Sequence, residues 1–312
     1  MSKLLVIFGA TGQQGGSIVE YVLNDSILSK EFKVRAVTRD PSNPAARALE
    51  KKGVEVVKAD ADDEESVKKA IIGAHTIFAV TVTNYDERLK EREFSQVKAI
   101  ANAAVETGAP YLIFSTLPNP TAVSGGRYKN CDVFNSKAEA EEYIRTLPIK
   151  SAFFAPGFFM QNFQGFISPQ PLGDGTYAIS NFIRPETKLP LIDIVGDTGK
   201  FVGAMLAEPD KYEGKVFSAA TALYSLNEIV ETISKISGKT VKYNQVPESA
   251  FRGVLPMPPV GVDNIMEMFA YYQDPGYYGP SSNELVEWTA QQATGKLTTF
   301  EEYLVENPLH LD

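Results

Sequence analysis

Short apolar runs alternate with helical patterns through the first half of the chain. The runs lie at 4–8, 33–38, 54–58, 76–82, 111–115 and 151–155. The first has the near-continuous apolarity of a strand buried on both faces. Between the fourth and fifth runs, apolar residues recur at helical spacing from Phe94 to Val105, and Gly108 and Pro110 end the pattern. The alternation predicts an α/β fold with a Rossmann-type, doubly wound parallel sheet.

The pattern changes after Pro156 and Gly157, where glycine, proline and aromatic residues become frequent. We expect a Rossmann-type domain over 1–156 and a smaller C-terminal α/β lobe over 157–312, covering the carboxyl ends of the strands. The division is not clean in sequence, because a strand at 215–219 is expected to rejoin the main sheet. The other expected elements are a strand at 189–195 and helices at 198–206, 225–236, 262–272 and 299–306.

The stretch VIFGATGQQGG at 6–16 is the most informative motif. Gly9, Gly12 and Gly15 follow a predicted strand and open a predicted helix. Glycines let a backbone approach a pyrophosphate closely, and the N–H groups of a helix start face its negative charge. The spacing G-x-x-G-x-x-G differs from the commonest G-x-G-x-x-G form, and a purely structural turn is the alternative. The strand–turn–helix context favours a dinucleotide site.

Residues after the second and third strands bear on which dinucleotide binds. Arg39 directly follows the strand at 33–38, where a guanidinium suits the 2′-phosphate of NADP. Asp40 comes next and suits the ribose hydroxyl of NAD. We expect NADP(H) to be preferred over NAD(H), with a solvated turn as the alternative for Arg39. Asp60, Asp62 and Asp63 are expected near the adenine edge. For Asp62 and Asp63, a cap of the following helix is an equally good interpretation.

Composition excludes several functional classes. The 312 residues carry a formal net charge of −9, which disfavours direct nucleic-acid binding. The chain has only two histidines, which disfavours a histidine-based metal site or a histidine-dependent triad. Its one cysteine cannot form an internal disulfide. No apolar stretch reaches about 18 residues, and the N-terminus has no signal pattern. We expect a cytoplasmic protein without a bound metal or membrane contact.

Several segments together resemble the NmrA-like proteins, atypical members of the short-chain dehydrogenase/reductase superfamily. These are GATGQQGG, VRAVTRD, VVKADADD, TNYDE, the helix of Lys137, and PGFFMQNF at 156–163. The resemblance covers nearly the full length and implies a Rossmann-type domain with a smaller lobe, binding NADP(H) or NAD. It places around the cofactor Gly9, Thr11, Gly12, Gln14, Gly15, Arg39, Asp60 and the segment from Thr81 to Asn84.

The catalytic residues of the superfamily are present only in part. Its reductases polarise a carbonyl with a tyrosine, a lysine four residues later and a serine on the fifth strand. Ser115 and Lys137 match the serine and the lysine, but Val133 stands where the tyrosine is expected. Tyr128 lies nine residues before Lys137, out of helical register. The usual general acid is therefore missing.

Lys137 is nevertheless a candidate catalytic and cofactor-binding residue. Ser136 and Glu139 form a capping-box pattern that predicts Lys137 in a first helical turn, where a positive charge opposes the macrodipole. Such a lysine would hold the nicotinamide ribose or act as a general acid or base. An exposed lysine tolerated at small cost is the alternative, and Ser115 has the alternative of a strand-end cap.

Aromatic residues cluster at 153–160, 271–272 and 277–278. They predict either the wall of an apolar pocket over the nicotinamide or core packing between the lobes.

Two functions fit these patterns. An intact nucleotide loop with an incomplete catalytic set favours an NADP(H)-binding, redox-sensing regulator with a protein partner, as the resemblance implies for some NmrA-like proteins. The alternative is an NADPH-dependent reductase of a quinone, carbonyl or conjugated small-molecule acceptor. A nucleotide-sugar epimerase or dehydratase is disfavoured by the missing tyrosine. Homodimerisation and an additional nuclear location stay open.

Overall fold

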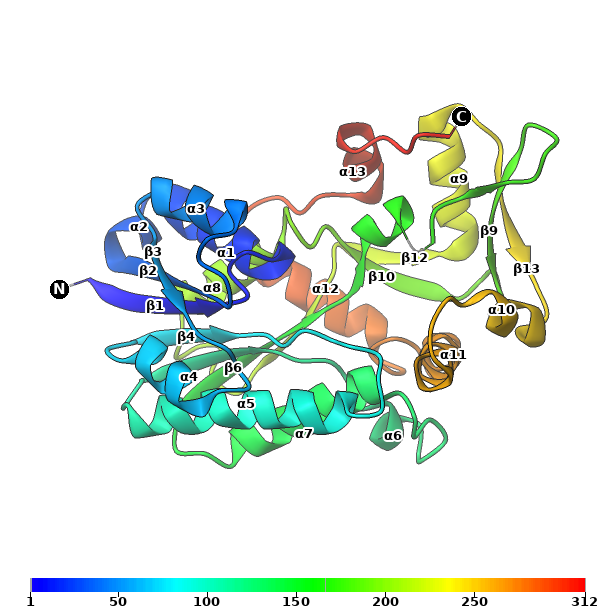
Figure 1. The fold of residues 1–312 in the computed structure, drawn as a ribbon. Helices are drawn as coiled ribbons and strands as arrows, with labels where there is room; N and C mark the ends of the chain where they lie inside the picture. The colour runs from blue at the N-terminus through cyan, green and yellow to red at the C-terminus, as the bar shows by residue number, and fades with distance from the viewer. Residues whose placement is uncertain (1, 166, 312) are drawn as a thin grey trace.

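The computed structural model describes residues 2–165 and 167–311, which form a mixed α/β architecture (Figure 1). Seven parallel strands form the main sheet, in the order β11-β6-β5-β4-β1-β2-β3. Their bounds are β1 Lys3–Phe8, β2 Phe32–Thr38, β3 Glu55–Lys58, β4 Thr76–Ala79, β5 Tyr111–Ser115, β6 Lys150–Pro156 and β11 Val216–Ala219. The strand order reverses between β1 and β4, which is where an open α/β sheet binds its ligand.

Helices cover both faces of this sheet, as the sequence predicts. One face carries α1 Gln13–Asn24, α2 Leu28–Glu31, α3 Pro44–Lys51 and α8 Thr198–Ala207. The other carries α4 Glu64–Ile71, α5 Leu89–Glu106 and α7 Asp132–Arg145, and the short α6 Pro120–Val123 precedes α7. The sheet is therefore doubly wound.

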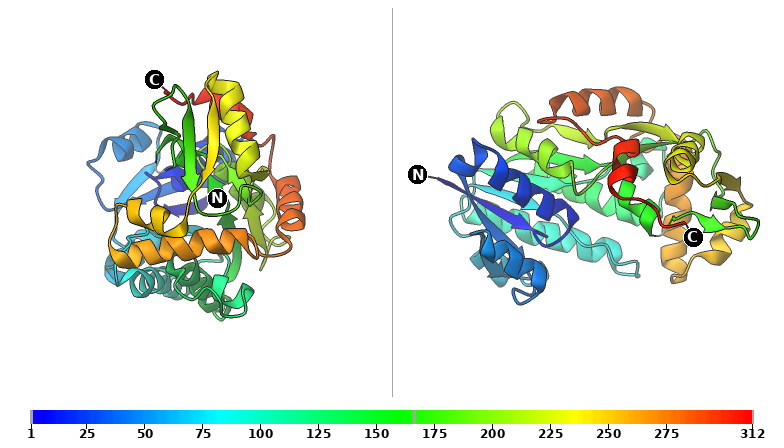
Figure 2. Two further views of the ribbon diagram at one scale, coloured as in Figure 1. Left: turned by 90° about the vertical axis from the view of Figure 1, so that its right-hand side faces the viewer. Right: turned by 90° about the horizontal axis from the view of Figure 1, so that it is seen from above.

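Two small sheets and several helices build the C-terminal lobe (Figure 2). One sheet joins β12 Ala222–Ser225, β10 Lys188–Ile192 and β7 Phe158–Phe159, and the other joins β13 Val241–Gln245, β9 Tyr177–Asn181 and β8 Gln170–Pro171. The 3₁₀ helix η1 Met160–Gln164 and the helices α9 Leu226–Ser237, α10 Glu248–Val254, α11 Pro259–Gln273 and α13 Phe300–Glu306 complete it. Its core is an aromatic-rich cluster that also includes Val133 and Phe134 of α7.

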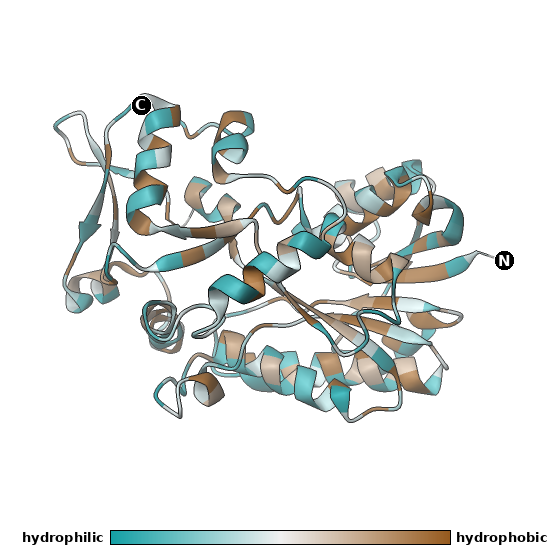
Figure 3. Cartoon of the chain, turned by 180° about the vertical axis from the view of Figure 1, so that it is seen from behind, coloured by the Kyte–Doolittle hydropathy of each residue, from teal (hydrophilic) through white to brown (hydrophobic). Residues whose placement is uncertain are grey.

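The expected return of 215–219 to the main sheet is confirmed, because β11 pairs in parallel with β6. The helix α12 Ser282–Gln292 also lies against β11, and Thr289 accepts a hydrogen bond from the Ser218 backbone. The sequence pattern misses α12 because it has no continuous apolar stripe; in Figure 3 it crosses the middle of the view as a largely hydrophilic helix. The domain boundary after residue 156 stays a prediction.

Two strands end earlier than predicted. β4 stops at Ala79 instead of residue 82, and 80–83 enter an irregular loop. β10 stops at Ile192 instead of residue 195, because the Asp193 carbonyl accepts a turn hydrogen bond from the Asp197 N–H. Apolar composition alone does not show where such a turn begins.

The α1–α8 contact depends on two glycines. A Cβ on Gly199 would lie 2.4 Å from Tyr21 Cβ, and one on Gly203 would lie 2.4 Å from Tyr21 Cε1. Tyr21 therefore packs against α8 at the two positions, Gly199 and Gly203, where α8 carries no Cβ.

We predict that Gly203→Ala lowers the free energy of unfolding by about 1–3 kcal/mol, because the added methyl overlaps the Tyr21 ring. Gly253→Ala is the control, since a Cβ there meets nothing within 4 Å. Urea unfolding of both variants checks this, and equal stabilities would contradict the packing described.

Candidate functional site

The glycine loop forms a tight turn between β1 and α1. The Gly12 N–H donates to the Gly9 carbonyl at 2.9 Å, and Gly9 has a left-handed φ of +66°. A Cβ on Gly15 would lie 2.3 Å from the Gly9 carbonyl oxygen, so α1 approaches the turn as closely as a bare backbone allows.

The start of α1 is suited to an anion. No side chain in the described part of the chain caps α1, which leaves its first-turn N–H groups available. The side-chain oxygen Oε1 of Gln14 is buried and has no hydrogen-bond partner among the described residues. An uncapped helix start beside a glycine turn and an unpaired amide fit the pyrophosphate of a dinucleotide.

Arg39 and Asp40 have different surroundings after β2. Ser42 donates both its N–H and its hydroxyl to Asp40, and these hydrogen bonds hold the pKa of that carboxyl below its usual range. Arg39 is exposed and forms no hydrogen bond or ion pair with any residue that the structure describes. The guanidinium is thus free to bind an added phosphate, while the neighbouring carboxylate is engaged.

The acidic residues after β3 divide into separate roles. Asp63 caps α4 by accepting from the N–H groups of Glu65 and Ser66. Asp62 accepts from the Gln96 amide, and half-buried Asp60 accepts from the Asp62 N–H. The cap interpretation is confirmed for Asp63 and wrong for Asp62.

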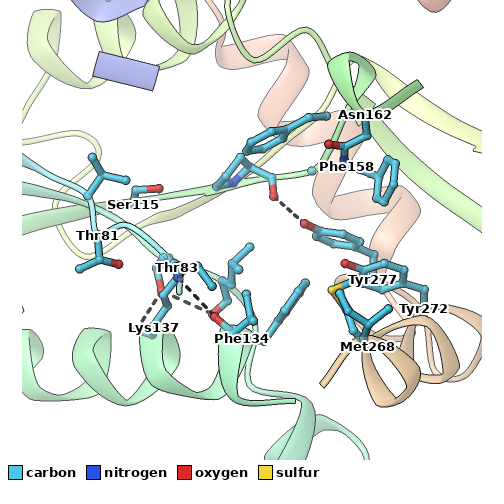
Figure 4. A pocket seen from close by; sticks show the side chains of 18 of the residues that line it. Thr81, Thr83, Ser115, Phe134, Lys137, Phe158, Asn162, Met268, Tyr272 and Tyr277 are labelled. Atoms are coloured by element: carbon cyan, nitrogen blue, oxygen red, sulfur yellow. Dashed lines mark hydrogen bonds between the residues drawn. The ribbon is translucent and has the colours of Figure 1, made fainter. Parts of the chain in front are cut away.

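A cavity of about 460 Å³ opens beside the glycine loop, between the strand ends and α11 (Figure 4). The loop and sheet side contributes Gln14, Thr81, Thr83, Ser115, Thr116 and Lys137, and the far side contributes Phe158, Phe159, Ile265, Met268, Phe269, Tyr272 and Tyr277. Four predicted site residues, Gln14, Thr81, Ser115 and Lys137, therefore meet at one cavity. Gly9, Thr11, Gly12, Gly15, Arg39, Asp60 and Asn84 are not in its lining, and their cofactor contacts stay predictions.

The expected capping box at Ser136 is wrong. α7 begins at Asp132, so Lys137 lies in its second turn. The cap comes from α11, where Asn264 Oδ1 accepts from the N–H of Asp132 at 2.6 Å and of Val133 at 3.3 Å. A cap donated by a segment more than a hundred residues away leaves no local sequence pattern.

Lys137 is buried and paired with a glutamate that the sequence analysis does not single out. Lys137 Nζ lies 2.5 Å from Glu93 Oε2, and the Glu93 side chain is 1% exposed. The hydroxyls of Thr81, Thr83 and Ser136 also donate to this carboxylate. The interpretation of Lys137 as an exposed lysine is therefore wrong. The sequence contains a pattern that indicates a buried Glu93: it lies four residues before Val97 and seven before Ile100, on the buried face of α5.

The tyrosines near the cavity are buried or donate their hydroxyls to backbone carbonyls. Tyr128 donates its hydroxyl to the Ala270 carbonyl and Tyr277 to the Pro156 carbonyl. Burial raises the pKa of Tyr85 to about 12 and that of Tyr272 well above its usual value. None of them replaces the missing tyrosine in sequence register with Lys137.

The aromatic cluster serves both predicted purposes. Phe153 and Phe154 are fully buried in the main-sheet core. Phe158 and Phe159 line the cavity, as does Tyr272, which stacks on Tyr277 with 4.7 Å between ring centroids. The cavity wall and the core of the C-terminal lobe are therefore one packed unit.

Comparisons with known proteins agree with this geometry. The model of the NmrA-like family matches residues 1–304. An NmrA-like family domain-containing protein of Dictyostelium discoideum is 29% identical over the whole length of both chains. The NmrA-like oxidoreductase FrzB of Cladobotryum sp is 29% identical, covering 91% of this chain and 88% of its own. The negative transcriptional regulator NmrA, solved in complex with NADP, has a TM-score of 0.83 at 21% identity, covering 98% and 95%.

Across the described ranges, no helix is long and apolar enough to cross a membrane.

We predict that Asn264→Ala lowers the free energy of unfolding by about 1–2 kcal/mol, because two buried N–H groups of α7 lose their acceptor. Asp263→Ala is the control: this exposed neighbour pairs with Arg252 at the surface, and its loss is expected to cost less than about 1 kcal/mol. Chemical unfolding measures both, and an equal loss would show that the cap contributes nothing.

Proposed function

This chain belongs to the NmrA-like family, and we propose that it binds a nicotinamide dinucleotide, NADP(H) in preference to NAD(H), to reduce an apolar, conjugated small molecule. The cofactor pyrophosphate would lie at the start of α1, and the acceptor in the cavity between the main sheet and α11.

The fit of the cofactor is supported by the glycine turn, the uncapped start of α1 and the unpaired Gln14 amide oxygen. Exposed Arg39, beside an Asp40 already bound by Ser42, supports the preference for a 2′-phosphate. Thr81, which lines the cavity, and Asn84 of the same loop would also contact the cofactor. The related NmrA was solved with NADP.

The observation that carries the reductase proposal is the cavity itself. Gln14 of the glycine loop and Phe269 and Tyr272 of α11 line the same space, so a ligand there would lie between the cofactor site and an aromatic wall. Flat conjugated rings stack on such a wall and exclude water. Bound NADPH would supply the hydride. Lys137 and Ser115 line the same cavity, where the ammonium group and the hydroxyl would face the acceptor oxygen.

A redox-responsive regulator is the second candidate, and the observation favouring it is the side chain at position 133. Valine stands where reductases of the superfamily have their proton-donating tyrosine, and the cavity tyrosines are held neutral by burial. In this candidate the protein would bind a regulatory protein partner according to its cofactor state. For either candidate we propose a cytoplasmic location.

We predict that Arg39→Ala weakens NADPH binding at least about tenfold, the effect of losing a charge-assisted phosphate contact, while NADH binding changes less than about twofold. Calorimetric titration of the parent and of Arg39→Ala with NADP⁺, NADPH, NAD⁺ and NADH measures these affinities. Equal losses for all four would place Arg39 outside the 2′-phosphate site, and no binding by the parent would refute the cofactor proposal.

We predict NADPH oxidation by the parent with members of a quinone and conjugated-carbonyl panel. Met268→Trp should raise the acceptor KM at least about tenfold by filling the cavity, with NADPH affinity unchanged. Met268→Leu preserves the side-chain volume and serves as the control. Tight NADPH binding without turnover across the panel would reject the reductase and leave the regulator.

A further inference from the structure

Glu93 is a buried carboxylate at the site that neither candidate function assigns. It comes from α5 and lies behind the cavity lining, with 1% of its side chain exposed. Burying a carboxylate is costly unless its oxygens accept hydrogen bonds and its charge is balanced.

The surroundings of Glu93 satisfy both requirements. Oε2 accepts from Thr81, Ser136 and Lys137, and Oε1 accepts from the Thr83 hydroxyl at 2.6 Å. The donors come from the loop after β4 and from α7. Glu93 therefore joins the loop predicted to contact the cofactor with the helix that carries Lys137.

The hydrogen bonds of Lys137 differ in length. Nζ donates to Glu93 at 2.5 Å, to Thr83 Oγ1 at 3.2 Å and to the Val133 carbonyl at 3.4 Å (Figure 4). These three acceptors match the three protons of an ammonium group. A ligand in the cavity would compete most easily with the longest of them, while the Glu93 contact keeps Nζ in place.

We infer that Glu93 is the positioning residue of this site, which pairs with Lys137 and holds its ammonium group at the cavity wall. The other titratable groups of the cavity lining are Tyr85 from the loop after β4, Tyr272 from α11 and Tyr277 beyond it. These remain neutral, so Glu93 supplies the negative charge. The effect on catalysis described below rests on the proposed reductase function. The effect of Glu93 on Lys137 itself does not depend on that function.

The direct test measures the protonation of Lys137 by ¹⁵N NMR of lysine-labelled protein across a pH series. The Lys137 signal is assigned by its absence in Lys137→Arg. Removing the nearby negative charge disfavours the ammonium form. In Glu93→Gln the Lys137 signal should therefore titrate at least about one pH unit lower than in the parent. Glu91→Gln is the control, since Glu91 is exposed on the same helix and pairs with Arg88. An unchanged titration in Glu93→Gln would overturn the inference.

Thr83→Val is the second variant, in case Glu93→Gln does not fold. It removes one donor to the carboxylate and one acceptor of Lys137, so its Lys137 titration should shift in the same direction by a smaller amount. With Glu93→Gln lost to misfolding, an unshifted Thr83→Val signal would overturn the inference.

Kinetics then separates this inference from the proposed function. If the parent reduces an acceptor, its kcat/KM should fall as the pH is raised. In Glu93→Gln this fall should occur at a lower pH than in the parent, and in Glu91→Gln it should occur at the same pH. A parent without turnover would refute the reductase, while the NMR titration would still decide the role of Glu93. Turnover with the same pH profile in Glu93→Gln and the parent would refute the positioning role alone.

Discussion

The polar contacts between α7 and α11 hold the two walls of the cavity together. Asn264 caps the start of α7, and Glu267 accepts hydrogen bonds from the backbone and side chain of Asn130 just before it. The hydroxyls of Tyr277 and Tyr278 bind the carbonyls at the end of β6. The aromatic wall thus lies over the strand ends because specific hydrogen bonds place it there.

The same arrangement explains why a buried lysine is tolerated. Lys137 lies where the main sheet, α5 and α7 exclude most water, and an uncompensated ammonium group would be unstable there. Glu93 and three hydroxyls form a complete counter-ion site, supplied by segments that also bound the cavity. The charge pair therefore lies beside an apolar space although the superfamily tyrosine is replaced by Val133.

The sequence predicts the main-sheet strands from their apolar runs, and the family resemblance names Gln14, Thr81 and Ser115 as site residues. They meet because parallel strands place their carboxyl ends at one edge, beside the start of α1. It does not predict the capping of α7, where a local Ser136–Glu139 pattern matches a rule that Asn264 fulfils from elsewhere. It also misses α12, whose buried positions Ser282, Val286 and Thr289 include only one apolar residue and whose packing depends on β11.

By itself, the sequence determined the α/β class and the glycine turn, because periodicity, glycine spacing and strand order act over short stretches of chain. The family resemblance named Lys137 as a site residue, and only the structure shows that it is buried at the cavity. Only the tertiary structure decided which charge pairs with Lys137, what caps its helix and which aromatic residues line the cavity rather than the core. These depend on contacts between segments separated by tens to more than a hundred residues, and burial makes each contact energetically decisive.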